Sequence, residues 1–276
     1  MIEREVALLK DLGVRYVRLE FLWWQIEPER GRFEWSVTDY IVAKCREAGL
    51  ELVPQLVYAP NWAAPKPIDP PADPMDYYRF VQVVVLRYHK EIHYWEMWNE
   101  PDIQGKYFSG DAAAYVNNLL KPGYEAAKAV DPDCFVLIAG ISQGGGTDFL
   151  VRCYRAGAAP YFDIANYHCY GSPKDVIRLG ADFRGIMAAH GDEAKPLWLT
   201  EYGYMELAAP HDLYQQMLIR AIHTDNPYIQ AAFYYELRDD DIYDAPDHVL
   251  KSETFGLLTK DYTPKDAYAT FKGIAQ

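Results

Sequence analysis

Cysteine is scarce in this chain, which has 4 cysteines among 276 residues and no CxxC pair. A disulfide scaffold of this length would need more cysteines, and zinc or redox sites typically need the closer spacing. We therefore expect mostly buried free thiols at these positions, which are Cys45, Cys134, Cys153 and Cys169.

Basic residues are fewer than acidic ones, with 27 Lys and Arg against 40 Asp and Glu, and the formal net charge is -13. This charge repels nucleic-acid phosphates and anionic membranes, so neither is an expected partner. No apolar run is long enough to span a membrane, and the charged residues 1–10 do not resemble a signal peptide. We expect a soluble chain, which would be secreted only if a longer precursor carries a signal.

Apolar and aromatic residues are plentiful. Hydrophobic residues make up 50% of the chain and aromatic residues 15%, including 7 Trp and 23 Tyr. That is enough for a sizeable core, and the length is typical of a single α/β barrel. We expect one domain over residues 1–276, with some of the aromatic excess available for stacking on sugars.

Short runs rich in Val, Ile, Leu and Tyr alternate with longer segments of helical period, which predicts an α/β protein. The predicted strands are 14–21, 50–58, 93–98, 134–139, 162–167, 196–200 and 230–236. The predicted helices are 1–12, 37–48, 75–88, 111–130, 147–156, 173–190, 211–223 and 264–274. Such alternation implies parallel strands joined by right-handed crossovers, in either an open sheet or a barrel.

A glycine fingerprint for nucleotide binding is absent after the first strand, where Leu22-Trp23-Trp24 stands instead. The cluster Gly144 to Gly146 lacks the GxGxxG spacing and reads as a loop into the next helix. These features favour a (β/α)8 barrel of the TIM type. In such barrels the reactive groups stand at the carboxyl ends of the strands.

Two acids stand at predicted strand ends, Glu100 in "MWNEP" and Glu201 in "LWLTEYGY". A single acid there is most often a solvated loop residue. Two carboxylates that converge from different strands are what glycosidic bond cleavage needs, because one protonates the leaving oxygen while the other attacks or activates water.

The stretches Trp98-Asn99-Glu100-Pro101 and Thr200-Glu201-Tyr202-Gly203 resemble the clan A retaining glycoside hydrolases. The resemblance extends over nearly the whole chain, through "VRYVRLEFLWWQIEPERGRFEW", "YAPNWA", "NYHCYG", "FYYELRDD" and "FGLLTKDYTPKDAY". It is closest to family 39 and related bacterial polysaccharide glycosidases, with family 5 cellulase-like enzymes second.

The resemblance implies a role for each matched residue. Glu100 would be the acid/base and Glu201 the nucleophile, with their carboxyl groups roughly 5 to 5.5 Å apart. Asn99 resembles the amide that bonds the sugar 2-hydroxyl. His168 and Tyr170 resemble the groups that orient the nucleophile.

Arg18 resembles the arginine beneath the nucleophile that keeps it ionised. Taken alone, a strand Arg, His or Tyr is more often a satisfied interior residue than a functional one. Glu96, on the same strand as Glu100 but below its end, is interpreted as an internal structural acid.

One departure from the family pattern concerns the sugar platform. Relatives usually carry a tryptophan on the eighth strand, where this chain has Tyr234-Tyr235, so Tyr235 would provide a smaller stacking surface. Further loop aromatics that could stack on sugars are Trp62, Trp24 and Tyr204.

The predicted function is a retaining O-glycoside hydrolase that acts on a plant or bacterial oligosaccharide or polysaccharide. The alternatives are a weak or inactive carbohydrate-binding barrel and a transglycosylase that uses the same intermediate. We expect a carbohydrate substrate, no cofactor, no metal, and a monomer or weak dimer. The acidic run Asp239-Asp240-Asp241 is interpreted as a solvated turn rather than a calcium loop.

The resemblance makes strand 14–21 the second of the barrel, so the first strand would be missing from this chain. Strands 14–21 and 230–236 would then each present an unpaired edge at one seam. Loss of upstream residues is the favoured explanation. Closure by another segment or a second chain, or an error in the strand count, are the alternatives.

Overall fold

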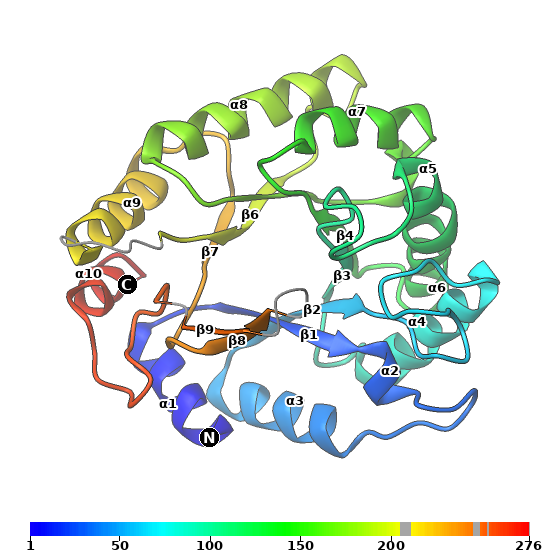
Figure 1. Ribbon diagram of the computed structural model, residues 1–276, viewed down its shortest axis with the longest axis horizontal. Helices are drawn as coiled ribbons and strands as arrows, with labels where there is room; N and C mark the ends of the chain where they lie inside the picture. The colour runs from blue at the N-terminus through cyan, green and yellow to red at the C-terminus, as the bar shows by residue number, and fades with distance from the viewer. Residues whose placement is uncertain (205–210, 245–248, 253, 276) are drawn as a thin grey trace.

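The structure is a computed structural model that describes residues 1–204, 211–244, 249–252 and 254–275. Parallel strands form an open ring with helices around it (Figure 1). The strands of the ring are β1 (Tyr16–Leu22), β2 (Glu51–Val57), β3 (Tyr94–Asn99), β4 (Phe135–Gly140), β5 (Ala165–Cys169), β6 (Leu197–Tyr202) and β7 (Ala231–Tyr234). The α/β barrel architecture and all of the predicted strands are confirmed.

The predicted helices are also present, and some are divided differently. Over the described residues they are α1 (Ile2–Leu12), α2 (Trp23–Ile26), α3 (Ser36–Ala48), α4 (Pro74–Tyr88), α5 (Ala112–Tyr115), α6 (Lys121–Val130), α7 (Gly146–Arg155), α8 (Pro173–Ala189), α9 (His211–Asp225) and α10 (Asp266–Ala275). A π-helical turn, η1 (Val116–Leu120), joins α5 to α6 just before Pro122, which has no N–H to donate. A 3₁₀ turn, η2 (Ala159–Tyr161), precedes β5.

Local signals explain where several helices begin. Asp73 caps α4 by accepting from the Met75 amide, and Pro74 follows at the first helical position. Ser172 and Asp175 form a capping box at the start of α8.

None of the described helices combines the length and apolar character needed to cross a membrane.

The strands form two parallel sheets, β1-β2-β3-β4 and β5-β6-β7. Single bridges from Leu137 to Ile164 and from Ile141 to Tyr167 link β4 to β5, so the wall runs without a break from β1 to β7. It does not close on itself, because no β-bridge or backbone hydrogen bond joins β1 to β7 within the described residues. The predicted open seam is therefore confirmed.

An aromatic layer fills the amino-terminal end of the barrel. The ring of Tyr16 lies 5.5 Å from that of Tyr94 and 5.4 Å from that of Trp198, which in turn lies 5.8 Å from Phe233. Side chains alternate along a strand, so residues two positions apart face the same side. Tyr16, Tyr94 and Trp198 therefore lie beneath Arg18, Glu96 and Thr200, which follow two positions later on the same strands. The packed layer leaves the carboxyl ends of the strands as the open end.

The segment after β7 differs from the prediction. An antiparallel hairpin of β8 (Asp241–Asp244) and β9 (Val249–Ser252) follows. The interpretation of Asp239-Asp240-Asp241 as a solvated turn is wrong for Asp239, which is buried because Lys265 Nζ lies 2.7 Å from its carboxylate and supplies the compensating charge. The four cysteines are buried free thiols, as predicted.

Candidate active site

Glu100 stands immediately after β3, where the backbone is held in an unusual conformation. Its φ is 41° and that of Trp98 is 81°, which is the left-handed region that non-glycine residues rarely adopt. The Glu100 amide donates to the Gly140 carbonyl of β4 over 2.9 Å. Such strain persists where surrounding structure enforces it, and it fixes the direction of the Glu100 side chain, which is buried.

Glu201 lies on β6 beside an irregularity in the ladder. Tyr167 pairs with Leu199 and His168 pairs with Glu201, so β6 carries one extra residue, Thr200, opposite β5. A bulge of this kind re-aims neighbouring side chains. As a result both Thr200 and Glu201 reach groups in the barrel interior.

Arg18 connects two carboxylates at the centre of the barrel. Its Nε and Nη2 donate to Glu96 over 2.6 and 2.9 Å, and its Nη1 donates to Glu201 over 2.6 Å. The side chain of Glu96 is 0% exposed. Such a buried charge needs a paired cation, so Glu96 is a structural acid that positions Arg18, as the sequence indicated.

Asn99 joins the same network. Its Oδ1 accepts from Arg18 Nη2 over 3.0 Å, and its side chain also hydrogen bonds to the Tyr58 hydroxyl. Arg18 thus fixes the orientation of the amide that precedes Glu100.

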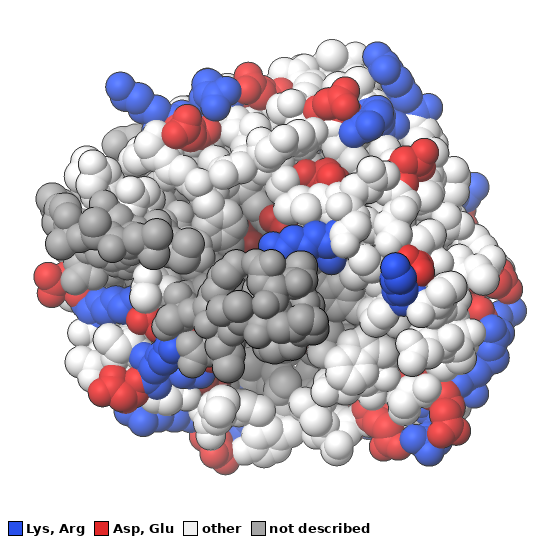
Figure 2. All heavy atoms as spheres, in the orientation of Figure 1, with Lys and Arg blue, Asp and Glu red and all other residues white. Residues whose placement is uncertain are grey.

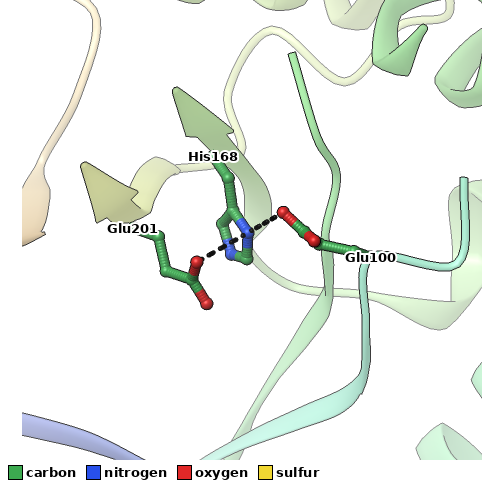
Figure 3. A group of neighbouring side chains, drawn as sticks. All are labelled: Glu100, His168 and Glu201. Carbon is green, nitrogen blue, oxygen red and sulfur yellow. Dashed lines mark hydrogen bonds and ion pairs between the residues drawn. The ribbon is translucent and has the colours of Figure 1, made fainter. Parts of the chain in front are cut away.

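His168 lies between the two acids at the strand ends (Figure 3). Its Nδ1 is 2.9 Å from Glu100 Oε1 and 3.4 Å from Glu201 Oε2. On the other side of the ring, Nε2 hydrogen bonds with Thr200 Oγ1 over 3.0 Å. Gly140 leaves the space that the imidazole occupies, because a Cβ there would lie 1.9 Å from Nε2.

The surroundings keep Glu201 ionised. Burial raises the pKa of its carboxyl, but the charges of His168 and Arg18 and the hydrogen bonds from Tyr170 and Arg18 outweigh burial, so the pKa lies below its usual value. The Tyr170 hydroxyl donates to Glu201 Oε2 over 2.6 Å. Burial raises the pKa of Tyr170 well above its usual value, so this hydroxyl keeps its proton near neutral pH.

A cleft of about 780 Å³ opens above these groups. Most of the predicted site residues line it, and Arg18 lies beneath. The ring of Tyr235 meets that of Tyr170 edge to face at 5.9 Å. The predicted residues that line the cleft are Asn99, Glu100, His168, Tyr170, Glu201 and Tyr235.

Three predicted aromatic residues are not among those that line the cleft. Trp62 donates its indole N–H to the Glu27 carbonyl and lies under the guanidinium of Arg30. Trp24 is an exposed residue of α2. Tyr204 stacks on Tyr214 of α9 with ring centroids 5.1 Å apart. The structure therefore does not bring these rings to the carboxylates.

The cleft also contains residues that the sequence reasoning missed. Glu20 lies two positions beyond Arg18 on β1, so the period of two along a strand could have placed it inside. Burial raises the pKa of Glu20, with the charge of Arg18 opposing and that of Glu201 adding to the effect. Tyr58, which follows β2 with φ of 61°, and Lys106 also line the cleft.

The side chains in Figure 3 are close enough to hold a metal ion. One donor atom from each of Glu100, His168 and Glu201 lies within 4.8 Å of the others. Each of the three already has protein partners, since Glu201 accepts from Arg18 and Tyr170 while His168 bridges to Glu100. The arrangement as it stands is a pair of carboxylates with His168 between them.

Solved structures of glycosidases share the fold. A glucosidase from Croceicoccus marinus superposes with a TM-score of 0.80 at 18% identity, over 98% of this chain and 63% of that one. A family 39 glycoside hydrolase from Bacteroides cellulosilyticus gives 0.80 at 21%, over 100% and 60%. A GH39 β-xylosidase from Caulobacter crescentus gives 0.78 at 19%, over 98% and 66%. This chain thus spans 60 to 66% of their lengths, and the expected likeness to family 39 is confirmed.

Sequence comparisons agree with the fold. A curated β-galactosidase, Bga from Halorubrum lacusprofundi, is 40% identical over 52 residues, which is 18% of this chain and 7% of that protein. The family model described as "Beta-galactosidase" matches residues 1–69. The model described as "Glycosyl hydrolase catalytic core" matches residues 76–256, which is more than half of the chain. The chain therefore belongs to the glycosyl hydrolase catalytic core family.

Proposed function

We propose that residues 1–276 form one catalytic domain of a retaining O-glycoside hydrolase, with Glu201 as nucleophile and Glu100 as acid/base. The observation that carries the proposal is the close pair of carboxylates, since an oxygen of each lies within 4.8 Å of the other. Retaining enzymes hold their carboxyl groups about 5 to 5.5 Å apart, whereas inverting enzymes need about 6.5 to 9.5 Å to admit a water. The short separation supports double displacement.

The first step would break the bond between the anomeric carbon and the leaving oxygen. The oxygen keeps the electron pair and takes the proton of Glu100, while Glu201 forms an ester to the anomeric carbon. Arg18 and Tyr170 favour this step because they keep Glu201 ionised and hold both of its oxygens in place.

In the second step a water gives its proton to the Glu100 carboxylate, and its oxygen attacks the anomeric carbon as the ester to Glu201 breaks. Two inversions give net retention. His168, bonded to Glu100 at 2.9 Å, would hold that carboxyl toward the reacting oxygen in both steps.

The charge of the cleft supports a neutral sugar as substrate. Four acids line it, which are Glu20, Glu100, Asp102 and Glu201, against the single lysine Lys106 in the described lining. An acidic sugar would be repelled, whereas a neutral pyranose can stack on Tyr235. We propose a plant or bacterial oligosaccharide or polysaccharide of neutral sugars, bound by a monomer or weak dimer.

Lys and Arg alternate with Asp and Glu around the described part of the face in Figure 2, which offers no broad basic patch.

The test combines variants of the two acids with azide. Aryl β-glucosides, β-xylosides and β-galactosides would first be screened beside a β-galacturonide. Glu201→Ala should abolish turnover, and azide should restore it by giving a glycosyl azide of inverted configuration. Glu100→Ala should keep activity on substrates with good leaving groups, and azide should then give the retained configuration. Proton NMR of the anomeric centre reports both products.

The matched control is Glu47→Ala, which changes an exposed glutamate of α3. It should behave as the unchanged protein. If Glu201→Ala and Glu100→Ala also kept near-normal activity, the assignment would be wrong. If no glycoside were turned over, an inactive carbohydrate-binding barrel would be favoured, and products longer than the substrate would indicate a transglycosylase.

A further inference from the structure

One acid of the cleft, Glu20, lacks the hydrogen bonds that hold the other three. Glu100 and Glu201 bond to the residues around them, and Asp102 accepts from the amide and the hydroxyl of Ser142 over 3.0 and 2.5 Å. Within the described part of the chain no hydrogen bond or ion pair holds the carboxylate of Glu20. A carboxylate without donors in a cleft is available to a ligand that supplies them.

Glu20 lies at the carboxyl end of β1, where its side chain is exposed to the cleft. It follows Arg18 by two positions, so it faces the same side of the strand about 7 Å nearer the open end of the barrel. Arg18 in turn bonds the proposed nucleophile Glu201 over 2.6 Å. The surrounding protein removes part of the hydration of Glu20 and raises its pKa, and the charge of Arg18 opposes this effect. Glu20 therefore stands above the nucleophile, at a separation that a single sugar ring can span.

The Tyr58 hydroxyl supplies a donor beside this acceptor. Tyr58 follows β2, the neighbour of β1 (Figure 1), and lines the same cleft. Burial and then the charge of the nearby Glu20 raise the pKa of Tyr58, so its hydroxyl keeps its proton. Asn99 Oδ1 accepts from Arg18 over 3.0 Å, so the part of the amide that bonds Tyr58 is its N–H, which donates to the phenol oxygen. No acceptor for the Tyr58 O–H is found among the residues that the structure describes, so this proton is available to a ligand.

An acceptor beside a donor matches a hydroxyl group, because a hydroxyl both donates and accepts. An ammonium group can only donate, so it would leave the Tyr58 proton without a partner. A carboxylate can only accept, and Glu20 would repel it.

We propose that Glu20 and Tyr58 together bind one hydroxyl of the sugar ring whose anomeric carbon lies at Glu201, with the sugar donating to Glu20 and accepting from Tyr58. This hydroxyl is at C3 or C4, the hydroxyl-bearing ring carbons farthest from the anomeric carbon, because Glu20 stands a ring's width above the nucleophile. The inference rests on the proposed function, and it makes Glu20 and Tyr58 the residues that select sugars carrying a hydroxyl at that position.

The test is a cycle of protein variants against sugars that lack single hydroxyls. The p-nitrophenyl glycoside of the preferred sugar is compared with its 2-, 3- and 4-deoxy analogues in the unchanged protein, in Glu20→Ala and in Tyr58→Phe. In the unchanged protein, loss of the bound hydroxyl should lower kcat/KM about 10- to 100-fold, because a hydrogen bond to a charged group is lost. In Glu20→Ala this penalty should shrink at least about fivefold, while the penalties for the other hydroxyls stay the same. Tyr58→Phe should reduce the same penalty by a smaller factor.

Two conservative variants complete the kinetic comparison. Glu20→Gln keeps a neutral acceptor, so it should restore part of the penalty that Glu20→Ala loses. The matched control is Glu29→Gln, since the side chain of Glu29 is 69% exposed in the loop after α2. It should keep every penalty of the unchanged protein.

Methyl thioglycosides of the same sugars resist hydrolysis and give a readout that needs no turnover. Titration calorimetry should show weaker binding of one deoxy analogue by the unchanged protein, and no such difference in Glu20→Ala. The proposal is overturned if Glu20→Ala keeps every penalty, if only the penalty at C2 changes, or if the unchanged protein binds no thioglycoside. Tighter binding of a 3-amino or 4-amino analogue would also overturn it, because Glu20 would then be a cation site. None of these results alters azide rescue of Glu201→Ala and Glu100→Ala, which tests the proposed function separately.

Discussion

Replacing Arg18 by methionine tests the network beneath the proposed nucleophile. The guanidinium bonds Glu96 at 2.6 and 2.9 Å and Glu201 at 2.6 Å. The side chains of Arg18 and Glu96 are 7% and 0% exposed, so the change leaves Glu96 as a buried charge without its cation. Breaking such a pair destabilises the folded state by about 3–5 kcal/mol. At about 2–4 °C per kcal/mol, the melting temperature should fall by roughly 6–20 °C.

Adding Glu96→Gln to Arg18→Met separates stability from activity. Glutamine removes the unpaired charge, and its amide oxygen can still accept from the Gly140 amide, which donates to Glu96 over 2.8 Å. We expect the double variant to regain most of the lost stability. Activity should stay low, because Glu201 still lacks its cation.

The pH profile reports the nucleophile directly. Arg18 is one of the groups that outweigh burial and hold the pKa of Glu201 below its usual value. Removing Arg18 raises that pKa, so Glu201 takes up a proton at a higher pH than before. The acidic limb of kcat/KM should therefore move to higher pH in both the single and the double variant.

Thermal unfolding, urea unfolding and kcat/KM against pH are the measurements. Arg15→Met is the matched control, because Arg15 precedes β1 and bonds Glu51 at 3.0 Å while its side chain is 67% exposed. Exposed pairs of this kind contribute about 0–1 kcal/mol, so this variant should keep its stability and its pH profile. The reasoning is refuted if Arg18→Met costs no more stability than Arg15→Met, or if the acidic limb does not move.

Two further substitutions test the groups around the acids. Gly140→Ala places a Cβ 1.9 Å from His168 Nε2, so kcat/KM should fall at least about tenfold. The control is Gly185→Ala, which should change kcat/KM little because its Cβ meets nothing within 4 Å. Equal kinetics of the two alanine proteins would contradict this packing argument. Tyr170→Phe removes a 2.6 Å hydrogen bond to Glu201. Because hydrogen bonds to charged groups contribute about 1.5–3 kcal/mol, kcat/KM should fall about 10- to 100-fold. The acidic limb of the pH profile should also move to higher pH. An unmoved limb would count against the role of Tyr170.

Strands β2 to β6 could be predicted because burial on both faces leaves a local trace. Each is a short and mainly apolar run, and β2, ELVPQLV, is buried at six of its seven positions. The hairpin of β8 and β9 left no such trace, since its first strand is the polar stretch DIYD. Short strands outside the main sheet depend on partners more than on their own sequence.

The pair of acids could be found from strand ends, whereas their partner Arg18 was predicted only through the resemblance to the family. Arg18 bonds to residues 78 and 183 positions away in the sequence, and nothing local to Arg18 specifies either contact. For aromatic residues, a position at or after a strand end was not enough to predict which of them line the cleft. Trp62 and Tyr235 both follow or end predicted strands, but only Tyr235 lines the cleft, because the Trp62 indole is bonded to the Glu27 carbonyl.

The open seam and the candidate active site share a wall. Glu201 and Tyr235 line both the cleft and the cavity between β1 and β7, and Arg18 also borders that cavity. The strength of the Arg18–Glu201 pair depends on the polarisability of its surroundings, which is greater in water than in packed protein. Because Arg18 and Glu201 both border this cavity as well as each other, what fills the cavity bears on the strength of the pair. The cavity between β1 and β7 is therefore physically coupled to the charge of the proposed nucleophile through Arg18.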